Sequence, residues 1–203
     1  MFITFEGLDG AGKSTQIERL AARLRAAGRP VLLTREPGGT PLGDALRALL
    51  LDPARRDMAP AAEALLYAAS RAQLLHERVR PALARGEVVV CDRFVDASLA
   101  YQGAGLGLGE EAVASINRFA TGGLRPDLTF LMDIPVRVSR TRVAGGRSGA
   151  DRIEQRDDEY FSVVRDAFLR IAAKEPDRVV VLDGTRDAAW LEQEIWAHVE
   201  KIL

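Results

Sequence analysis

Short apolar runs rich in Val, Leu, Ile and Phe recur along the chain. Five of them are candidate strands, namely Met1–Phe5, Val31–Arg35, Val88–Asp92, Leu128–Asp133 and Val179–Asp183. Continuous apolar runs of this length are typical of strands that are buried on both faces of a sheet. Segments with helical spacing lie between them, and strands that alternate with helices predict a parallel sheet covered on both faces. We therefore expect an α/β fold with a five-stranded parallel sheet.

Apolar residues at intervals of three and four predict the connecting helices. The first follows residue 12 and ends near Gly28, and the longest runs from about Pro60 to Arg85. The expected buried stripe of the longest helix is Leu65, Ala68, Ala72, Leu75 and Val79. The other predicted helices are Leu42–Leu51, Glu110–Phe119, Val136–Val143, Asp157–Ala173 and Ala188–Ile202.

A polar residue stands at or directly after the end of each predicted strand. These residues are Glu6, Arg35, Asp92, Asp133 and Asp183. Parallel strands all end at the same edge of their sheet, and doubly wound sheets bind their ligands at that carboxyl edge. We therefore expect the functional site there.

The composition is that of an ordinary globular protein. The 203 residues are 47% hydrophobic and 28% charged, which suffices for one core, so we expect residues 1–203 to form a single domain. A formal net charge of −1 gives no overall sign of binding to nucleic acid or to an anionic membrane, and we expect neither partner.

Cysteine usage and hydropathy predict a cytoplasmic protein. Cys91 is the only cysteine, so the chain has no disulfide framework, and its place at the end of an apolar run favours a buried structural thiol over a nucleophile. No run of 18 apolar residues occurs, and the N-terminus shows no basic segment followed by an apolar one.

The segment Gly7–Ser14, GLDGAGKS, matches the phosphate-binding pattern G-x-x-x-x-G-K-[ST]. It lies between a predicted strand and a predicted helix, which is the context that the pattern requires. Glycines let backbone N–H groups turn toward a polyphosphate, and the helix N-terminus adds the positive end of its dipole. In such a loop Lys13 reaches the β- and γ-phosphates, and the Ser14 hydroxyl binds Mg²⁺. The pattern favours a bound nucleoside triphosphate over a glycine-rich turn without a ligand.

Arginines gather at the strand ends, on the flanking helices and in a glycine-rich segment. They are Arg35, Arg47, Arg71, Arg93, Arg142, Arg147 and Arg152. A single such residue is usually a solvated surface group, but Arg35 and Arg93 stand at the ligand edge of the sheet. Transfer between two phosphates brings anions together, and one charge pair at about 4 Å repels by ~1 kcal/mol in water but ~4 kcal/mol at an effective dielectric of about 20. Guanidinium groups offset that repulsion, so the set indicates a phosphotransferase with a phosphorylated acceptor.

The glycine-rich segment Ala144–Ala150 predicts a mobile flap at about 142–154, because three glycines in seven residues disfavour a rigid element.

A phosphate acceptor is already ionised near pH 7 and needs no general base. We therefore interpret His76 and His198 as structural or surface groups. Asp92 follows an apolar run and is a candidate Mg²⁺ ligand together with Ser14, but Asp133 follows a similar run and is the alternative.

A phosphate-binding loop also occurs in ATPases, GTPases and nucleotide-gated binding proteins. The chain has no N-K-x-D sequence, which disfavours a GTPase. The acceptor-like arginines favour a kinase over a nucleotide-gated binding protein, because a gate does not require them. A kinase for another nucleoside monophosphate or for a deoxynucleoside stays open at this point.

Over essentially its whole length the sequence resembles the thymidylate kinase (dTMP kinase) family. The motifs that carry the resemblance are Phe5–Ser14, Thr34–Thr40, Tyr67-x-x-x-Arg71, Asp92-Arg93-Phe94, Tyr101-Gln102-Gly103 and Asp151-Arg152-Ile153-Glu154. The string Arg35–Thr40 is the most specific of them, and the phosphate loop is the least specific. Phe94 departs from the pattern, since the family often has Tyr or His there.

The resemblance implies a P-loop nucleoside monophosphate kinase fold and a magnesium-dependent reaction in dTTP synthesis, ATP + dTMP → ADP + dTDP. The implied cofactor-binding residues, which hold ATP, are Gly7, Asp9, Gly10, Ala11, Gly12, Lys13, Ser14, Thr15 and Arg142. The implied substrate-binding residues are Asp9, Arg35, Glu36, Pro37, Arg47, Tyr67, Arg71, Arg93, Ser98, Tyr101 and Gln102. The implied catalytic residues are Lys13, Arg93, Arg147 and Arg152. The family is dimeric, so we expect a homodimer.

Within this set the resemblance assigns the dTMP phosphate to Arg35, Arg47 and Arg93. It implies that Tyr67 stacks on thymine and that Arg71 bonds to the carbonyl edge of the base. Helical geometry agrees, since residues four apart share a helix face. Tyr101 matches an aromatic residue that lies under the sugar and crowds out a 2′-hydroxyl, and Ser98 and Gln102 match polar groups around the base.

Two further features concern the flap and the loop before it. Residues 8–11 contain no arginine while the flap has Arg147 and Arg152, so the chain resembles the bacterial type with a flap arginine. We expect Arg152 to contact the transferring phosphoryl group, with Arg147 as the alternative, and Arg142 to lie against adenine. The resemblance also implies a cis peptide bond between Glu36 and Pro37.

Overall fold

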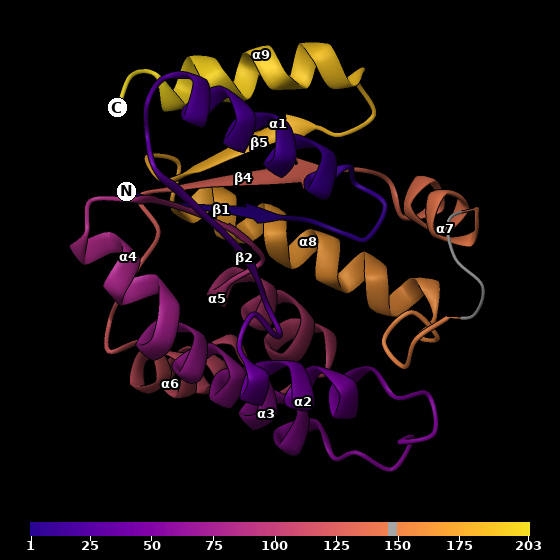
Figure 1. Ribbon diagram of the computed structural model, residues 1–203. Helices are drawn as coiled ribbons and strands as arrows, with labels where there is room; N and C mark the ends of the chain where they lie inside the picture. Colours follow the sequence, from indigo (N-terminus) through magenta and orange to yellow (C-terminus); the bar gives the residue numbers. More distant parts are fainter. Residues whose placement is uncertain (146–149) are drawn as a thin grey trace.

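The computed structural model describes residues 1–145 and 150–203. At its centre lies a parallel five-stranded sheet with the order β2-β3-β1-β4-β5 (Figure 1). The strands are β1 (Phe2–Glu6), β2 (Val31–Arg35), β3 (Val88–Asp92), β4 (Leu128–Asp133) and β5 (Val179–Asp183). Four of the five have the predicted bounds and β1 is shifted by one residue, which confirms the prediction of the fold class.

Nine α-helices and two short π-helical segments are described. The α-helices are α1 (Lys13–Ala26), α2 (Pro41–Leu51), α3 (Pro60–Leu74), α4 (Arg80–Ala84), α5 (Val95–Ser98), α6 (Glu110–Thr121), α7 (Val136–Ala144), α8 (Asp158–Lys174) and α9 (Ala188–Val199). The π-helical segments are η1 (Leu75–Val79), which joins α3 to α4, and η2 (Leu99–Gly105), which extends α5. The long helix predicted from about residue 60 therefore consists of α3, η1 and α4, whereas α5 and η2 were not predicted.

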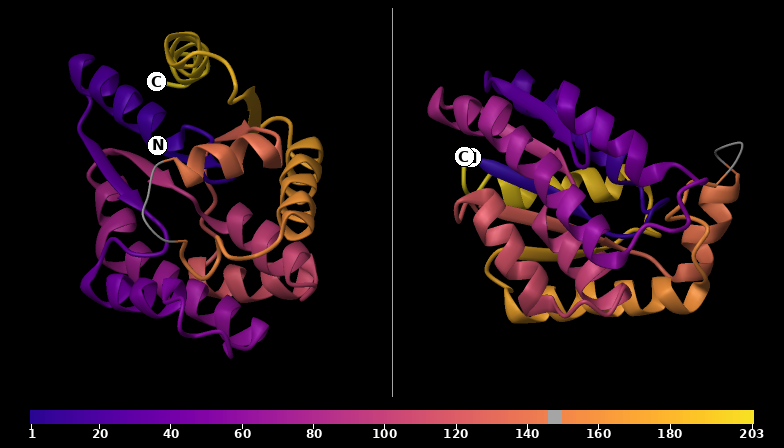
Figure 2. Two further views of the ribbon diagram at one scale, coloured as in Figure 1. Left: turned by 90° about the vertical axis from the view of Figure 1, so that its right-hand side faces the viewer. Right: turned by 90° about the horizontal axis from the view of Figure 1, so that it is seen from below.

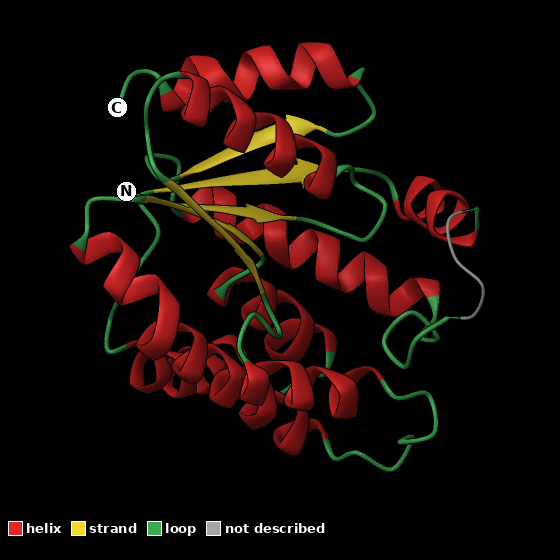
Figure 3. Ribbon diagram, viewed as in Figure 1, coloured by secondary structure: helices red, strands yellow, loops and turns green. Residues whose placement is uncertain are grey.

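Helices cover both faces of the sheet (Figures 1 to 3). Helices α1 and α9 pack together over one face, and α4 and α8 lie against the other. Successive side chains of β1 point to opposite faces of the sheet. Ile3 and Phe5 pack in the same core cluster as Leu24 of α1, while Phe2 packs with Leu75 and Phe94. Helix α3 contacts both α2 and α6, and the three helices form a further layer below α4 and α5.

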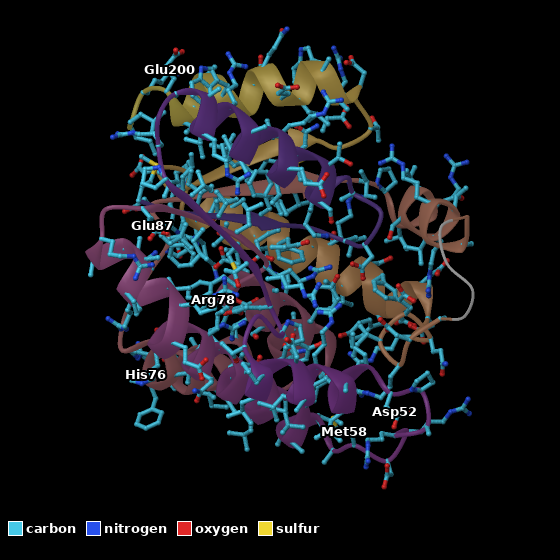
Figure 4. All side chains as sticks on the ribbon, in the orientation of Figure 1. Asp52, Met58, His76, Arg78, Glu87 and Glu200 are labelled. Carbon is cyan, nitrogen blue, oxygen red and sulfur yellow. The ribbon has the colours of Figure 1, made fainter. Side chains whose placement is uncertain are left out.

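The predicted buried stripe of α3 is partly wrong. The side chain of Leu65 is 55% exposed, whereas Glu63 and Arg71 are fully buried. Helical spacing marks a candidate face, but α3 turns a polar face inward because other parts of the chain supply partners for its charges. His76, just beyond α3, is exposed and points outward (Figure 4).

The predicted flap lies at the end of α7. Residues 142–144 belong to that helix, and residues 146–149, with Arg147 among them, lie outside the described residues. From Ala150 the chain forms a turn in which the Asp151 carboxylate accepts hydrogen bonds from the backbone N–H groups of Ile153 and Glu154. Among the described residues, no helix is both long and apolar enough to cross a lipid bilayer.

Candidate active site

The phosphate-binding loop joins β1 to α1 at the carboxyl edge of the sheet. Gly7 has a φ of 123°, and a Cβ there would lie 2.3 Å from the carbonyl oxygen of Met132, so only glycine fits between β1 and β4. Gly12 precedes α1 with a φ of 91°. The Nζ atom of Lys13 donates to the carbonyl oxygens of Gly7 at 3.1 Å and Leu8 at 2.9 Å. Burial and the nearby Arg93 charge lower the pKa of Lys13.

A cavity of about 430 Å³ opens beside this loop. Its lining contains most of the residues singled out by the sequence, namely Asp9, Gly10, Gly12, Lys13, Ser14, Thr15, Arg35, Glu36, Pro37, Arg47, Tyr67, Arg71, Asp92, Arg93, Ser98, Tyr101, Gln102 and Arg142. Gly7, Ala11 and Arg152 do not line it. Most of the residues that the sequence singles out therefore line one cavity at the carboxyl edge of the sheet.

Arg93 lies at the junction between the loop and the rest of the cavity. Its guanidinium donates to the carbonyl oxygen of Gly7 and to Asp9 Oδ1, each at 2.9 Å. The same group lies 5.0 Å from the centre of the Tyr101 ring. Arg93 has a φ of 71°, a left-handed conformation that side chains other than glycine rarely adopt, and this turn directs it toward the loop.

The two candidate metal carboxylates have different surroundings. Both oxygens of Asp133 accept hydrogen bonds from Arg165, at 2.7 and 2.8 Å. In the described part of the chain, Asp92 Oδ1 is buried without a hydrogen-bond partner and belongs to the cavity wall, as does Ser14. A buried carboxylate oxygen of this kind suits a divalent cation, whereas both oxygens of Asp133 are already paired with Arg165.

Helix α2 and the loop before it form a second basic wall. The Glu36–Pro37 peptide bond is cis, as expected. Arg47 of α2 donates to the Pro37 carbonyl oxygen at 3.0 Å, and Arg35 lies 3.9 Å from Asp44 with most of its side chain exposed. Arg35 at the end of β2 and Arg47 on α2 therefore both line the cavity.

Arg71 is fully buried and joins several segments. Its Nε donates to Glu36 Oε2 at 2.7 Å, and its Nη1 donates to Ser98 Oγ at 3.1 Å and to Asn117 Oδ1. Its Nη2 donates to the carbonyl oxygen of Phe94 at 2.9 Å. Burial raises the pKa of Glu36 to about 7, against the opposing effect of the Arg71 charge. These bonds hold the Arg71 guanidinium at the cavity wall.

The aromatic wall comes from α3 and η2. Tyr67 of α3 and Tyr101 of η2 both line the cavity, and Gln102 follows Tyr101. The Tyr101 ring packs edge-on against Tyr160 and Phe168 of α8, with ring centres 6.3 and 6.0 Å away. The site thus has a flat apolar part beside its arginines, which suits a nucleobase and a sugar.

The comparisons with known proteins agree with this geometry. The family model described as Thymidylate kinase matches residues 5–195. The chain belongs to the thymidylate kinase family. The thymidylate kinase of Deinococcus radiodurans is 54% identical over 201 residues, which cover 99% of this chain and 97% of that protein. The thymidylate kinase of Exiguobacterium sibiricum is 50% identical over 198 residues, covering 98% and 93%. The crystal structure of thymidylate kinase from Ehrlichia chaffeensis matches with a TM-score of 0.79 and 33% identity, covering 98% of each chain.

Membership of the thymidylate kinase family confirms several predictions from the sequence. The fold is that of the P-loop nucleoside monophosphate kinases. The chain is an ATP-dependent kinase of the nucleoside monophosphate class, which transfers the γ-phosphoryl group of ATP to dTMP and forms dTDP.

The two described arginines of the predicted flap differ in their placement. Arg142 donates to the carbonyl oxygens of Gly10 and Gly184, both at 3.0 Å, so it lies over the loop. Arg152 turns inward, with its Nη2 2.8 Å from Glu63 Oε2. A catalytic contact by Arg152 would require its guanidinium to leave Glu63. Arg147 lies outside the described residues.

Sequence reasoning missed several residues that support the site. Glu63, Asn117 and Tyr160 bond to residues of the cavity wall without lining the cavity, and Arg156 bonds to Glu63 and Tyr160 behind them. One signal was present for Glu63, which precedes Tyr67 by four residues, as Tyr67 precedes Arg71. The other three come from α6, α8 and the turn before α8, and no local pattern connects them to the motifs.

Proposed function

We propose that the cavity holds dTMP beside the phosphates of ATP and that its arginines carry the phosphoryl transfer of the family. The observation that supports this most strongly is the position of Arg93. Its guanidinium contacts the phosphate-binding loop through Gly7 and the aromatic wall through Tyr101. A single charged group that reaches both sides can bind the acceptor phosphate and the transferring phosphoryl group.

On the donor side, the loop residues 7–15 bind the ATP phosphates through backbone N–H groups and Lys13. Arg142 donates to the carbonyl oxygen of Gly10, and the adenine or ribose of ATP would lie on that side of the loop. Ser14 and Asp92 would hold Mg²⁺, and the unpartnered Asp92 Oδ1 supports this choice. The ion, when bound, would neutralise charge on the β- and γ-phosphates. The described residues contain no group of three or more His, Cys, Asp or Glu that could hold a metal, so two protein ligands would be completed by nucleotide oxygens and water.

On the acceptor side, we assign the dTMP phosphate to Arg35, Arg47 and Arg93. Tyr67 stacks on thymine, and Tyr101 limits the space at the sugar. The polar groups for the base are Arg71, Ser98 and Gln102, with Glu36 and Pro37 as the adjacent wall and Asp9 near the sugar. All of these residues line one cavity, which is what a bound nucleotide requires.

In the reaction an oxygen of the dTMP phosphate forms a bond to the γ-phosphorus as the bond from that phosphorus to the β–γ bridging oxygen breaks. ADP leaves with the bonding electrons, and no proton must be removed from the ionised acceptor. Lys13 and Arg93 bind the oxygens that gain charge. A flap arginine completes the set. Arg152 would have to move its guanidinium away from Glu63 to do so, and Arg147 is the alternative.

We also propose a homodimer. Four large apolar side chains are exposed on the layer formed by α2, α3 and α6, namely Leu42, Leu49, Leu65 and Phe119. Exposed apolar groups gathered on neighbouring helices are typical of a surface that a partner covers.

A cytoplasmic location stays a prediction, which rests on the single cysteine and its inability to form a disulfide within the chain.

A panel of acceptors tests this proposal. With Mg·ATP and coupled detection of ADP, we expect dTMP to give the highest kcat/KM among dTMP, dUMP, dCMP, dGMP and AMP. Lys13→Ala should abolish turnover. Equal turnover of AMP would contradict the assigned acceptor site, and ADP release that does not depend on any acceptor would indicate a nucleotide-gated binding protein instead.

A further inference from the structure

A buried carboxylate stands behind the acceptor site without touching the cavity. Glu63, in the first turn of α3, has no solvent-exposed surface. Its Oε1 accepts a hydrogen bond from Gln102 Nε2 at 2.9 Å. Its Oε2 accepts one from Arg156 Nη2 at 2.6 Å and lies 2.8 Å from Arg152 Nη2. One carboxylate therefore joins three segments that are distant in the sequence.

The contact with Arg152 leads to the basic wall. Arg152 donates from Nε to the carbonyl oxygen of Leu50 at 2.8 Å and from its backbone N–H to that of Leu51 at 3.2 Å. These carbonyls belong to the last turn of α2, where a helix has no backbone donors of its own for them. The same helix carries Arg47 one turn earlier, so Glu63 and Arg152 tie the turn that begins at Ala150 to the helix that presents Arg47.

The contact with Arg156 leads to the aromatic wall. Arg156 Nη1 donates to the hydroxyl oxygen of Tyr160, and that hydroxyl donates to the Tyr101 carbonyl oxygen at 3.0 Å. Gln102, the next residue, is the one that Glu63 binds directly. Both ends of this chain of bonds therefore reach η2, the segment that holds Tyr101 at the cavity.

The charge of Glu63 is essential to the arrangement. Two guanidinium groups share one carboxylate oxygen, and all three side chains are largely buried. If the carboxylate is made neutral, two buried positive charges face each other without a counter-charge, and at least one must move toward water. That movement would release α2 or η2 from the segment between Ala150 and α8.

We propose that Glu63 is a positioning residue that holds the basic and aromatic walls of the acceptor site at the distance that dTMP requires. It acts through Arg152, Arg156 and Gln102 rather than by contact with a nucleotide. On α3, Glu63 precedes the proposed base-stacking Tyr67 by one turn, so one helix carries both the support and the contact. The inference rests on the proposed placement of dTMP.

Glu63→Gln is the direct test, because a glutamine oxygen still accepts the bond from Gln102 while the charge is lost. We expect the KM for dTMP to rise about tenfold or more. A displacement of about 1 Å of the groups that position a substrate can cost up to about 10²-fold in rate, and here the displaced groups are the walls that bind dTMP. The KM for ATP should change less than about threefold. The affinity for dTMP, measured by calorimetry without ATP, should fall in parallel. The matched control is Glu111→Gln on the exposed surface of α6, where Glu111 is 87% exposed and both KM values should stay unchanged.

A purely structural role would lower the melting temperature and the fraction of active enzyme, and with it the apparent kcat, while both KM values stay the same. That result would overturn the proposal. If Glu63→Gln does not fold, Arg156→Lys keeps the positive charge but loses the second guanidinium donor to Tyr160, and an unchanged KM for dTMP in that variant would also overturn it. Tyr67→Ala distinguishes a failure of the role proposed for Glu63 from a failure of the proposed acceptor site. If Tyr67→Ala weakens dTMP binding and Glu63→Gln does not, only the role of Glu63 fails, whereas no effect of Tyr67→Ala contradicts the acceptor site itself.

Discussion

Glu6 is a carboxyl group at the carboxyl edge of the sheet whose surroundings favour its neutral form. Glu6 ends β1, is fully buried, and accepts a hydrogen bond from the backbone N–H of Phe94 at 2.7 Å. Burial, reinforced by the Asp96 charge, raises the pKa of Glu6 from 4.5 to about 8 despite the opposing effect of Arg93. Glu6 is therefore largely protonated at neutral pH and fixes the backbone directly after Arg93.

This pKa predicts a pH dependence of stability. Because the pKa of Glu6 is higher in the folded state than in the unfolded chain, its stabilising effect is complete below about pH 4.5 and is lost as the pH rises through about 8. Glu6→Gln keeps an acceptor for Phe94 but cannot titrate. Urea unfolding at several pH values between 5 and 8 should therefore show a shallower fall in the free energy of unfolding for the variant. Parallel curves for the two proteins would contradict a raised pKa at Glu6.

At the scale of elements, the strands were predictable and the interior of the helical layer was not. Each buried strand is a continuous apolar run, and the pattern Gly7–Ser14 indicates both the turn and the helix that follows. The polar inner face of α3 could not be predicted, because Glu63 and Arg71 are buried only where α6, η2 and the turn before α8 bring them partners. The segment η2 was missed because its residues, Leu99–Gly105, lack a full helical repeat.

The segment η2 carries the prediction for sugar selectivity. Tyr101→Ala should lower the ratio of kcat/KM for dTMP to that for its ribonucleotide analogue about tenfold, because the proposed obstacle to a 2′-hydroxyl is removed. Tyr101→Phe is the control, since it keeps the ring and should keep the ratio. Steady-state kinetics with the two acceptors measure both variants, and an unchanged ratio in Tyr101→Ala would show that another residue excludes the ribonucleotide.

At the scale of the whole molecule, the exposed apolar residues of α2, α3 and α6 predict the oligomeric state. Phe119 of α6 is 92% exposed, and a charge there cannot be buried in an interface without a large cost. Phe119→Glu should therefore shift the protein from dimer to monomer in sedimentation or light-scattering measurements. Val181→Glu on β5, where Val181 is 46% exposed and lies away from these helices, should leave the mass unchanged. A wild-type monomer, or a Phe119→Glu dimer, would contradict the proposed surface.

Most of the candidate site could be predicted from the sequence because its residues belong to strand ends and to short family motifs. The contacts that support it could not, because they join residues far apart in the chain. Glu63 meets Arg156 across 93 residues, and Arg71 meets Asn117 across 46 residues. The inward turn of Arg152 has the same origin, since its partners Glu63 and Leu50 are supplied only by the folded chain.

The central claim is that two nucleotides meet in one arginine-lined cavity at the carboxyl edge of the sheet. A crystal structure with dTMP, Mg²⁺ and an ATP analogue that cannot transfer its phosphoryl group tests it most directly. We predict that the dTMP phosphate lies within hydrogen-bond distance of the Arg93 guanidinium and faces the terminal phosphate of the analogue above Gly10–Ser14. A dTMP molecule bound away from Tyr67 and Tyr101, or an acceptor phosphate without contact to Arg93, would contradict the claim.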